Sequence, residues 1–212
     1  MSALTGYAAA ARHLLLRLSF HRLEWRHHGL GMLQGELSED LRVHLFHPML
    51  RTIPKEGKRD VHDHRFTITS YIAYGSITDV PHSVYLEKDW IGTPPEVEAF
   101  RGRNWTKEDA WEIKHSKVQD GNDCTPLGRA WVLRHEEMPR VKGEVYTIPR
   151  REWHTTIVNE FAITLVNRSE FDEGPARILG GCHSAINRST PKETIGYVVD
   201  CAIGAQRRLF EH

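Results

Sequence analysis

The first part of the chain carries a helical pattern of apolar residues. Between residues 7 and 24, a run of alanines precedes Leu14, Leu15 and Leu18, and this spacing places the leucines on one face of a helix. Gly29 and Gly31 then break the pattern. We therefore expect an N-terminal helix that packs on the rest of the protein. A helix that contacts a membrane surface or a partner protein is the alternative.

After residue 40 the pattern alternates, as it does in a strand. Leu41, Val43 and Leu45 alternate with Arg42 and His44. Similar runs follow at 66–74, 84–87, 110–118, 129–136, 143–148, 154–158 and 161–166. Short strands without intervening helices indicate an antiparallel sandwich or barrel. Residues 94–106 are the longest expected loop, and a second short helix is expected at about 198–210.

Composition narrows the classes of function. The 212 residues contain 28 Lys and Arg and 28 Asp and Glu, so the formal net charge is zero and no nucleic-acid partner is expected. The apolar runs are too short to span a membrane, and the first twenty residues lack the basic start of a signal peptide. Cys124, Cys182 and Cys201 are widely spaced, which predicts no disulfide framework and favours a reducing, cytoplasmic setting.

One pair among the 14 histidines is spaced for metal binding. His62, Asp63 and His64 precede the run at 66–74, and we expect all of them to lie on one strand. Residues i and i+2 of a strand face the same side, about 7 Å apart, so the two imidazoles could reach one ion. Asp63 would point the other way and is a poor ligand. Neutral imidazole suits zinc, iron, copper and nickel.

A second segment strengthens this interpretation. Residues 143–159 contain Gly143, Pro149, His154 and Asn159, with a turn expected at the proline. Taken together, the two segments resemble the two motifs of the cupin superfamily, G-x5-HxH-x3,4-E-x6-G and G-x5-PxG-x2-H-x3-N. The resemblance covers residues 40–168, about 90 residues separate the motifs, and the long interval predicts an insertion in the barrel.

The chain departs from both motifs at particular positions. Gly57 lies one residue nearer the histidines than the first motif requires, and Asn159 lies one residue late in the second. Arg151 replaces the second motif's other glycine. Gly75 fits the end of the first motif, and Ile68 stands where the family carries a glutamate ligand.

The resemblance implies a single cupin-like domain over residues 1–212. It would be a mostly β, antiparallel barrel of the double-stranded β-helix or jelly-roll type, with an N-terminal helix and a short C-terminal helix. Residues 1–38 would form a helical extension, 40–168 the barrel and 169–212 a C-terminal segment.

Because isoleucine cannot bind a metal, the resemblance implies a site with three histidine ligands, His62, His64 and His154. Cupins with similar ligands include thiol dioxygenases and diketone-cleaving dioxygenases that use ferrous iron. We therefore expect a divalent metal, with Fe(II) first and zinc, manganese or nickel as alternatives. Three neutral ligands leave the ion its full charge, which favours an anionic bidentate substrate.

Strand alternation also predicts residues that line the substrate site. Phe66 and Ile68 share the face of the first two histidines, while Glu152 and Thr156 share the face of His154. His44 could line the same cavity or be an ordinary hydrogen-bonded histidine. Tyr71, Tyr74 and Tyr146 could orient a substrate or pack in the core, and His27, His28 and His47 are expected on the surface or in loops.

The expected function is that of a mononuclear non-haem iron oxygenase or dioxygenase, with a small-molecule substrate and dioxygen as partners. Two alternatives remain open at this stage. One is an isomerase or lyase that uses the metal without redox chemistry. The other is a non-catalytic barrel that binds a small ligand. Exposed sheet edges would also be compatible with a homodimer.

Overall fold

The strands of the chain pair into two antiparallel sheets. The computed structural model describes residues 3–28, 31–50, 61–100, 102–115, 122–180 and 190–210. The first sheet has the order β1-β2-β3-β11-β4-β9. Its strands are β1 (Trp25–His28), β2 (Met32–Glu36), β3 (Leu41–Phe46), β11 (Ala162–Ser169), β4 (Thr67–Tyr74) and β9 (Val145–Ile148).

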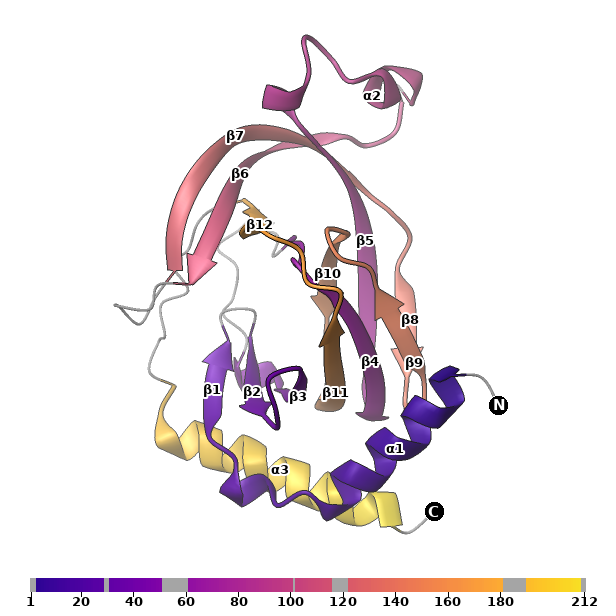
Figure 1. Ribbon diagram of the computed structural model, residues 1–212, viewed down its shortest axis with the longest axis vertical. Helices are drawn as coiled ribbons and strands as arrows, with labels where there is room; N and C mark the ends of the chain where they lie inside the picture. The colour runs from indigo at the N-terminus through magenta and orange to yellow at the C-terminus, as the bar shows by residue number, and fades with distance from the viewer. Residues whose placement is uncertain are drawn as a thin grey trace.

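The second sheet has the order β10-β5-β7-β6-β12, with β8 paired to β5. Its strands are β10 (Trp153–Ile157), β5 (Ser76–Leu86), β7 (Asn122–Arg134), β6 (Thr106–His115), β12 (Ala176–Leu179) and β8 (Met138–Val141). The long β6–β7 hairpin curves over one end of the molecule, and the short helix α2 (Pro95–Ala99) lies beyond it (Figure 1). The predicted β-rich antiparallel fold is confirmed.

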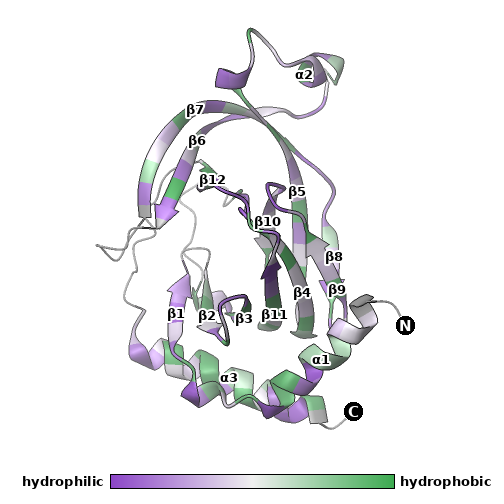
Figure 2. Ribbon diagram, viewed as in Figure 1, coloured by the Kyte–Doolittle hydropathy of each residue, from purple (hydrophilic) through white to green (hydrophobic). Residues whose placement is uncertain are grey.

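Two helices cover the outer face of the first sheet. Helices α1 (Ala3–Arg17) and α3 (Lys192–Phe210) lie together beneath the strands (Figure 1), and apolar and polar residues are interspersed along both (Figure 2). Leu15 and Ala202 are buried in one core cluster with Val43, Leu45 and Leu165 of the sheet. Burying a leucine side chain contributes about 1.5–3 kcal/mol. The opposite face of these strands is thereby left to line the barrel.

A short segment closes the second sheet into a ring. Residues 61–63, here called the bridging segment, pair with β10 on one side and β12 on the other. His62 and His154 exchange two backbone hydrogen bonds of 3.0 Å. On the other side, the Asp63 amide donates to the Arg177 carbonyl at 3.0 Å and the Leu179 amide donates to the Val61 carbonyl at 2.9 Å.

Gly75 makes the tight connection between the two sheets. It joins β4 to β5 with a φ of +71°, and a Cβ atom there would lie 2.3 Å from the Phe161 carbonyl oxygen. Only glycine has both the backbone freedom and the small size that this position requires.

Some predicted elements differ from the observed ones. The N-terminal helix ends at Arg17 rather than residue 24, because Phe20 is buried and stacks on Trp25 at 6.1 Å, which turns the chain back toward the sheet. Strands β1 and β2 lie in the segment expected to be a helical extension, and β12 lies in the C-terminal segment. Helix α2 occupies part of the expected loop, and α3 begins at Lys192, six residues before the predicted start.

The cysteines also differ from the prediction. The sequence predicts no disulfide framework, but Cys124 on β7 is disulfide-bonded, so the spacing of the cysteines does not support the expected reducing, cytoplasmic setting. Cys201 on α3 is a free thiol, and Cys182 and Gly57 lie outside the described residues. Among the described residues, no helix is both long and apolar enough to cross a membrane.

Candidate metal centre

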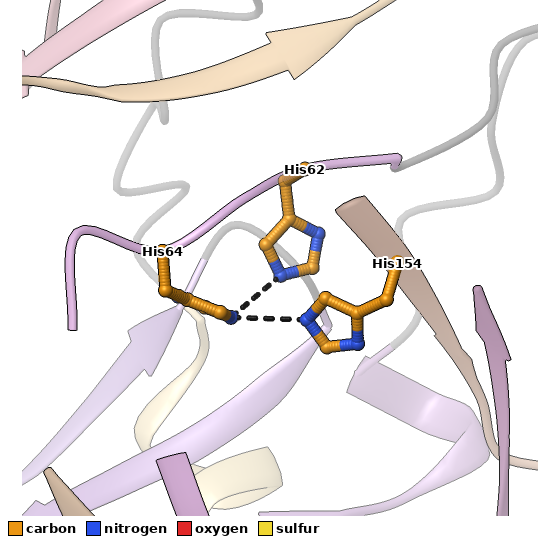
Figure 3. Close-up of side chains that lie close together, drawn as sticks. All are labelled: His62, His64 and His154. Atoms are coloured by element: carbon orange, nitrogen blue, oxygen red, sulfur yellow. Dashed lines mark hydrogen bonds between the residues drawn. The ribbon is translucent and has the colours of Figure 1, made fainter. Parts of the chain in front are cut away.

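Three histidine side chains converge at one point inside the barrel. The Nε2 atom of His64 lies 3.2 Å from Nε2 of His62 and 3.1 Å from Nε2 of His154 (Figure 3). One nitrogen from each ring lies within 4.8 Å of the other two. His62 and His154 are buried, and His64 is half-buried.

The backbone brings these rings together in a way that differs from the predicted strand. Strand β4 begins at Thr67, so neither early histidine belongs to it. His62 lies instead on the bridging segment, directly opposite His154 of β10. His64 follows that segment, and its carbonyl accepts a 2.7 Å hydrogen bond from the Arg151 amide.

The hydrogen bond between His154 and Asp79 favours a tautomer suited to metal binding. Asp79 of β5 is buried, and its Oδ1 lies 3.0 Å from Nδ1 of His154. A carboxylate is only an acceptor, so the Nδ1–H of His154 donates to it. In neutral His154 the Nε2 atom then carries a lone pair, and that atom points toward His64 (Figure 3).

The two nitrogen separations that involve His64 fit a shared ion better than a hydrogen-bonded chain. His64 Nε2 has one hydrogen or one lone pair in the ring plane, so it cannot make two good hydrogen bonds. Ligands at about 2.1 Å from an ion, separated by about 90–110°, lie about 3.0–3.4 Å apart. Burial, followed by the nearby His62 and His154, holds the pKa of His64 well below its usual value, which favours the neutral ring that a metal requires.

An ionic network holds the backbone between the first two histidines. Asp63 is buried, and its carboxylate accepts hydrogen bonds from the Arg177 amide at 2.6 Å and the Arg177 Nε at 2.7 Å. Arg151 lies 3.8 Å from the same carboxylate and has a φ of +65°, at the position where the cupin motif has glycine. The guanidinium of Arg177 also lies over the ring of Trp153, next to His154, at 4.9 Å. The Asp63 carboxylate is therefore engaged by arginines, and the three-histidine cluster does not include it.

The cluster lies in the wall of a cavity of about 100 Å³. Ile68 and Thr156 line it, and Phe66 stacks on His64 at a centroid distance of 5.3 Å. Glu152 is exposed and is not among the lining residues, because it precedes the first residue of β10 and strand alternation does not extend to it.

Three further residues line the cavity. The sequence left two interpretations open for two of them and placed the third elsewhere. His44 was expected either to line the cavity or to be an ordinary hydrogen-bonded histidine, Tyr146 either to orient a substrate or to pack in the core, and His47 to lie on the surface or in a loop. Burial raises the pKa of Tyr146 to about 12. The alternation of β3 and β9 could have identified His44 and Tyr146, whereas His47 follows the end of β3 and gives no such signal.

The barrel and its cluster have the arrangement that the two cupin-like sequence motifs imply. Curled antiparallel sheets surround a cavity whose wall carries an HxH pair and one histidine from a later strand. These features fit the cupin superfamily, as the two sequence motifs predict.

Comparisons with known proteins add only distant structural likenesses. No protein-family model and no curated protein matches the sequence. A polyketide cyclase, RemF from Streptomyces resistomycificus, has 15% identity and a TM-score of 0.38, with 84% of this chain and 95% of that chain covered. Hydroquinone 1,2-dioxygenase from Sphingomonas sp. TTNP3, solved with 4-hydroxybenzoate bound, has 9% identity and a TM-score of 0.29.

The match to that dioxygenase covers 63% of this chain and 62% of the dioxygenase chain, which is less than two thirds of its length. A Bacillus subtilis oxalate decarboxylase variant has 16% identity and a TM-score of 0.32, over 85% of this chain and 35% of that one. Likenesses this distant carry no argument about what this chain binds.

Proposed function

We propose that the protein is a metal-dependent cupin enzyme, specifically a mononuclear non-haem iron oxygenase. His62, His64 and His154 would hold the ion. The observation that carries this proposal is that Nε2 of His64 lies 3.1–3.2 Å from Nε2 of His154 and of His62, in the wall of a cavity. Ferrous iron bound there would supply Lewis acidity and one-electron chemistry toward dioxygen.

The donor set suits an anionic substrate with two donor atoms. All three proposed ligands are imidazoles, and Ile68, at the family's glutamate position, packs with Ile148 and Val166 in an apolar cluster. No carboxylate therefore reduces the charge of the ion from within this ligand set. A thiolate or enolate would be attracted to that charge.

Other side chains would prepare the site for the reaction. Asp79 holds the ring of His154, and the Asp63–Arg177 pair holds the backbone that carries His62 and His64. Apolar side chains along the cavity exclude water from around the substrate.

Metal binding tests the first part of the proposal. Protein reconstituted anaerobically with ferrous iron should bind about one ion per chain, measured by elemental analysis after desalting. His154→Ala should lower the affinity for iron by more than about 100-fold, since the hydrogen-bonding partners of metal ligands alone contribute about 10- to 100-fold. His13→Ala is the matched control, because His13 is exposed on α1. Wild-type protein that bound no iron would refute the proposal.

Oxygen uptake tests the second part. Iron-loaded protein should consume dioxygen with at least one member of a panel of small thiols and diketones, and zinc-loaded protein should consume none. Turnover with zinc or manganese and without oxygen uptake would contradict the oxygenase and identify a non-redox isomerase or lyase. Ligand binding without turnover under any metal would instead identify a non-catalytic binding barrel.

A further inference from the structure

His44 lies in the wall of the same cavity as the three-histidine cluster. It is on β3, opposite Thr164 of β11 on one side and Gln34 of β2 on the other. Its ring contacts Phe46 edge-on, at a centroid distance of 6.1 Å. Met32, Ile148 and Val166 are among the apolar residues that share the cavity lining.

The Nε2 atom of His44 has no hydrogen-bond partner among the described residues, although it is buried. Leaving a buried polar atom unpaired typically costs about 1–3 kcal/mol, so such atoms in native proteins call for an explanation. His154 in the metal centre is different, because its Nδ1 is bonded to Asp79 and its Nε2 lies 3.1 Å from Nε2 of His64.

The surroundings of His44 favour a neutral ring and an electron-rich ligand. Burial lowers the pKa of His44 to about 3, with smaller contributions from His28, Arg42 and Arg168. A neutral imidazole keeps one N–H donor. The two arginines make the local potential more positive, although Arg42 is partly compensated by Glu36 at 3.0 Å. An oxygen acceptor is therefore favoured over a donor group.

We propose that His44 is a substrate-binding residue whose Nε2–H donates a hydrogen bond to an oxygen acceptor of a small, mainly apolar ligand. This inference rests on the proposed function, since the other end of the ligand would bind at the metal centre. A cavity of about 100 Å³ accommodates a single ring or a short chain. The acceptor would be a carbonyl or carboxylate oxygen that lies away from the metal-binding end.

Cobalt(II)-loaded protein allows the two binding points to be tested separately, because ligands that reach cobalt change its absorption spectrum. Azide is the probe for the metal alone. Phenol, 3-hydroxybenzaldehyde and 4-hydroxybenzaldehyde are the probes for the whole cavity, since each of these aldehydes adds one oxygen acceptor to the same ring, away from the metal-binding hydroxyl. The proteins compared are the wild type, His44→Phe, which keeps a ring without a donor, and His44→Gln, which restores an N–H donor.

Azide should bind with equal affinity to all three proteins, which also shows that the variants are folded. In the wild type, at least one hydroxybenzaldehyde should bind about tenfold more tightly than phenol, the expected effect of one buried hydrogen bond. That advantage should disappear in His44→Phe and return in part in His44→Gln.

Two kinds of failure are distinguishable in this experiment. If cobalt and azide bind but no aldehyde is favoured over phenol, or if His44→Phe keeps the advantage, the role of His44 is refuted and the metal centre stands. If the wild type binds no cobalt, the metal centre itself is refuted, and the role of His44 is refuted with it.

Discussion

At the scale of single residues, the orientation of His154 depends on one buried carboxylate. Asp79 accepts the Nδ1–H of His154 at 3.0 Å, so the lone pair of Nε2 is left facing the other two rings. Asp79→Asn removes the charge from this hydrogen bond while keeping the shape of the side chain. We expect the affinity for ferrous iron to fall by about 10- to 100-fold, measured by competition with a chelator.

Asp109→Asn provides the control for this substitution, because Asp109 is exposed on β6 and should leave iron affinity unchanged. Equal affinities for Asp79→Asn and the wild type would show that the carboxylate does not act on the proposed ligand. A Tm close to that of the wild type would separate an effect on the metal from a loss of folding.

The sequence predicted the convergence of three histidines but missed the residues that support them. His62, His64 and His154 were found because the first two are spaced two residues apart and the third falls within a second recognisable motif. Asp79 lies on a part of β5 that the sequence pattern did not assign to a strand, and it reaches His154 only through the pairing of β5 with β10. Such a contact depends on strand register, which alternation along one strand does not specify.

At the scale of elements, the β4–β5 turn depends on a glycine. Gly75→Ala would place a methyl group 2.3 Å from the Phe161 carbonyl oxygen at a φ of +71°. We expect the free energy of unfolding to fall by at least about 2 kcal/mol, because the substitution combines backbone strain with a clash against β11. Urea unfolding followed by circular dichroism measures this loss.

Gly143→Ala is the matched comparison for the turn. Gly143 also has a positive φ, +91°, but apart from its two chain neighbours no described residue has an atom within 4 Å of the position that its Cβ would occupy. Its substitution should cost only the backbone strain, about 1 kcal/mol. If the two variants lost the same stability, the clash with Phe161 would not be the cause.

The sequence pattern predicted strands well where apolar and polar residues alternate along the chain. The alternation at 41–46 corresponds to β3 with the same bounds. It missed β1 and β2, since nearby glycines break the local pattern and only pairing with β3 defines these strands. The bridging segment was also assigned wrongly, as a continuation into β4, because its partners are more than 90 residues away in the sequence.

At the scale of the whole molecule, burial of His44 makes stability depend on pH. The pKa of His44 is about 3 in the folded protein and near 6.5 in the unfolded chain. Between these values the unfolded chain binds more protons, so the free energy of unfolding falls as the pH is lowered, by up to about 1.4 kcal/mol per pH unit. Above pH 6.5 this contribution is constant.

Urea unfolding of metal-free protein between pH 7.5 and 4.5 measures the dependence. His44→Phe should show a shallower decline over this interval than the wild type, since it lacks the group that must stay neutral. Parallel curves for the two proteins would mean that the pKa of His44 is the same in the folded protein and in the unfolded chain.

The bridging segment has a consequence for assembly of the chain with itself. Strands β10 and β12 would otherwise end the second sheet with unpaired backbone groups, which readily recruit strands from other molecules. The bridging segment, which includes His62, therefore covers the exposed edges of both β10 and β12. A substitution that displaces this segment should therefore promote aggregation as well as disturb the position of His62.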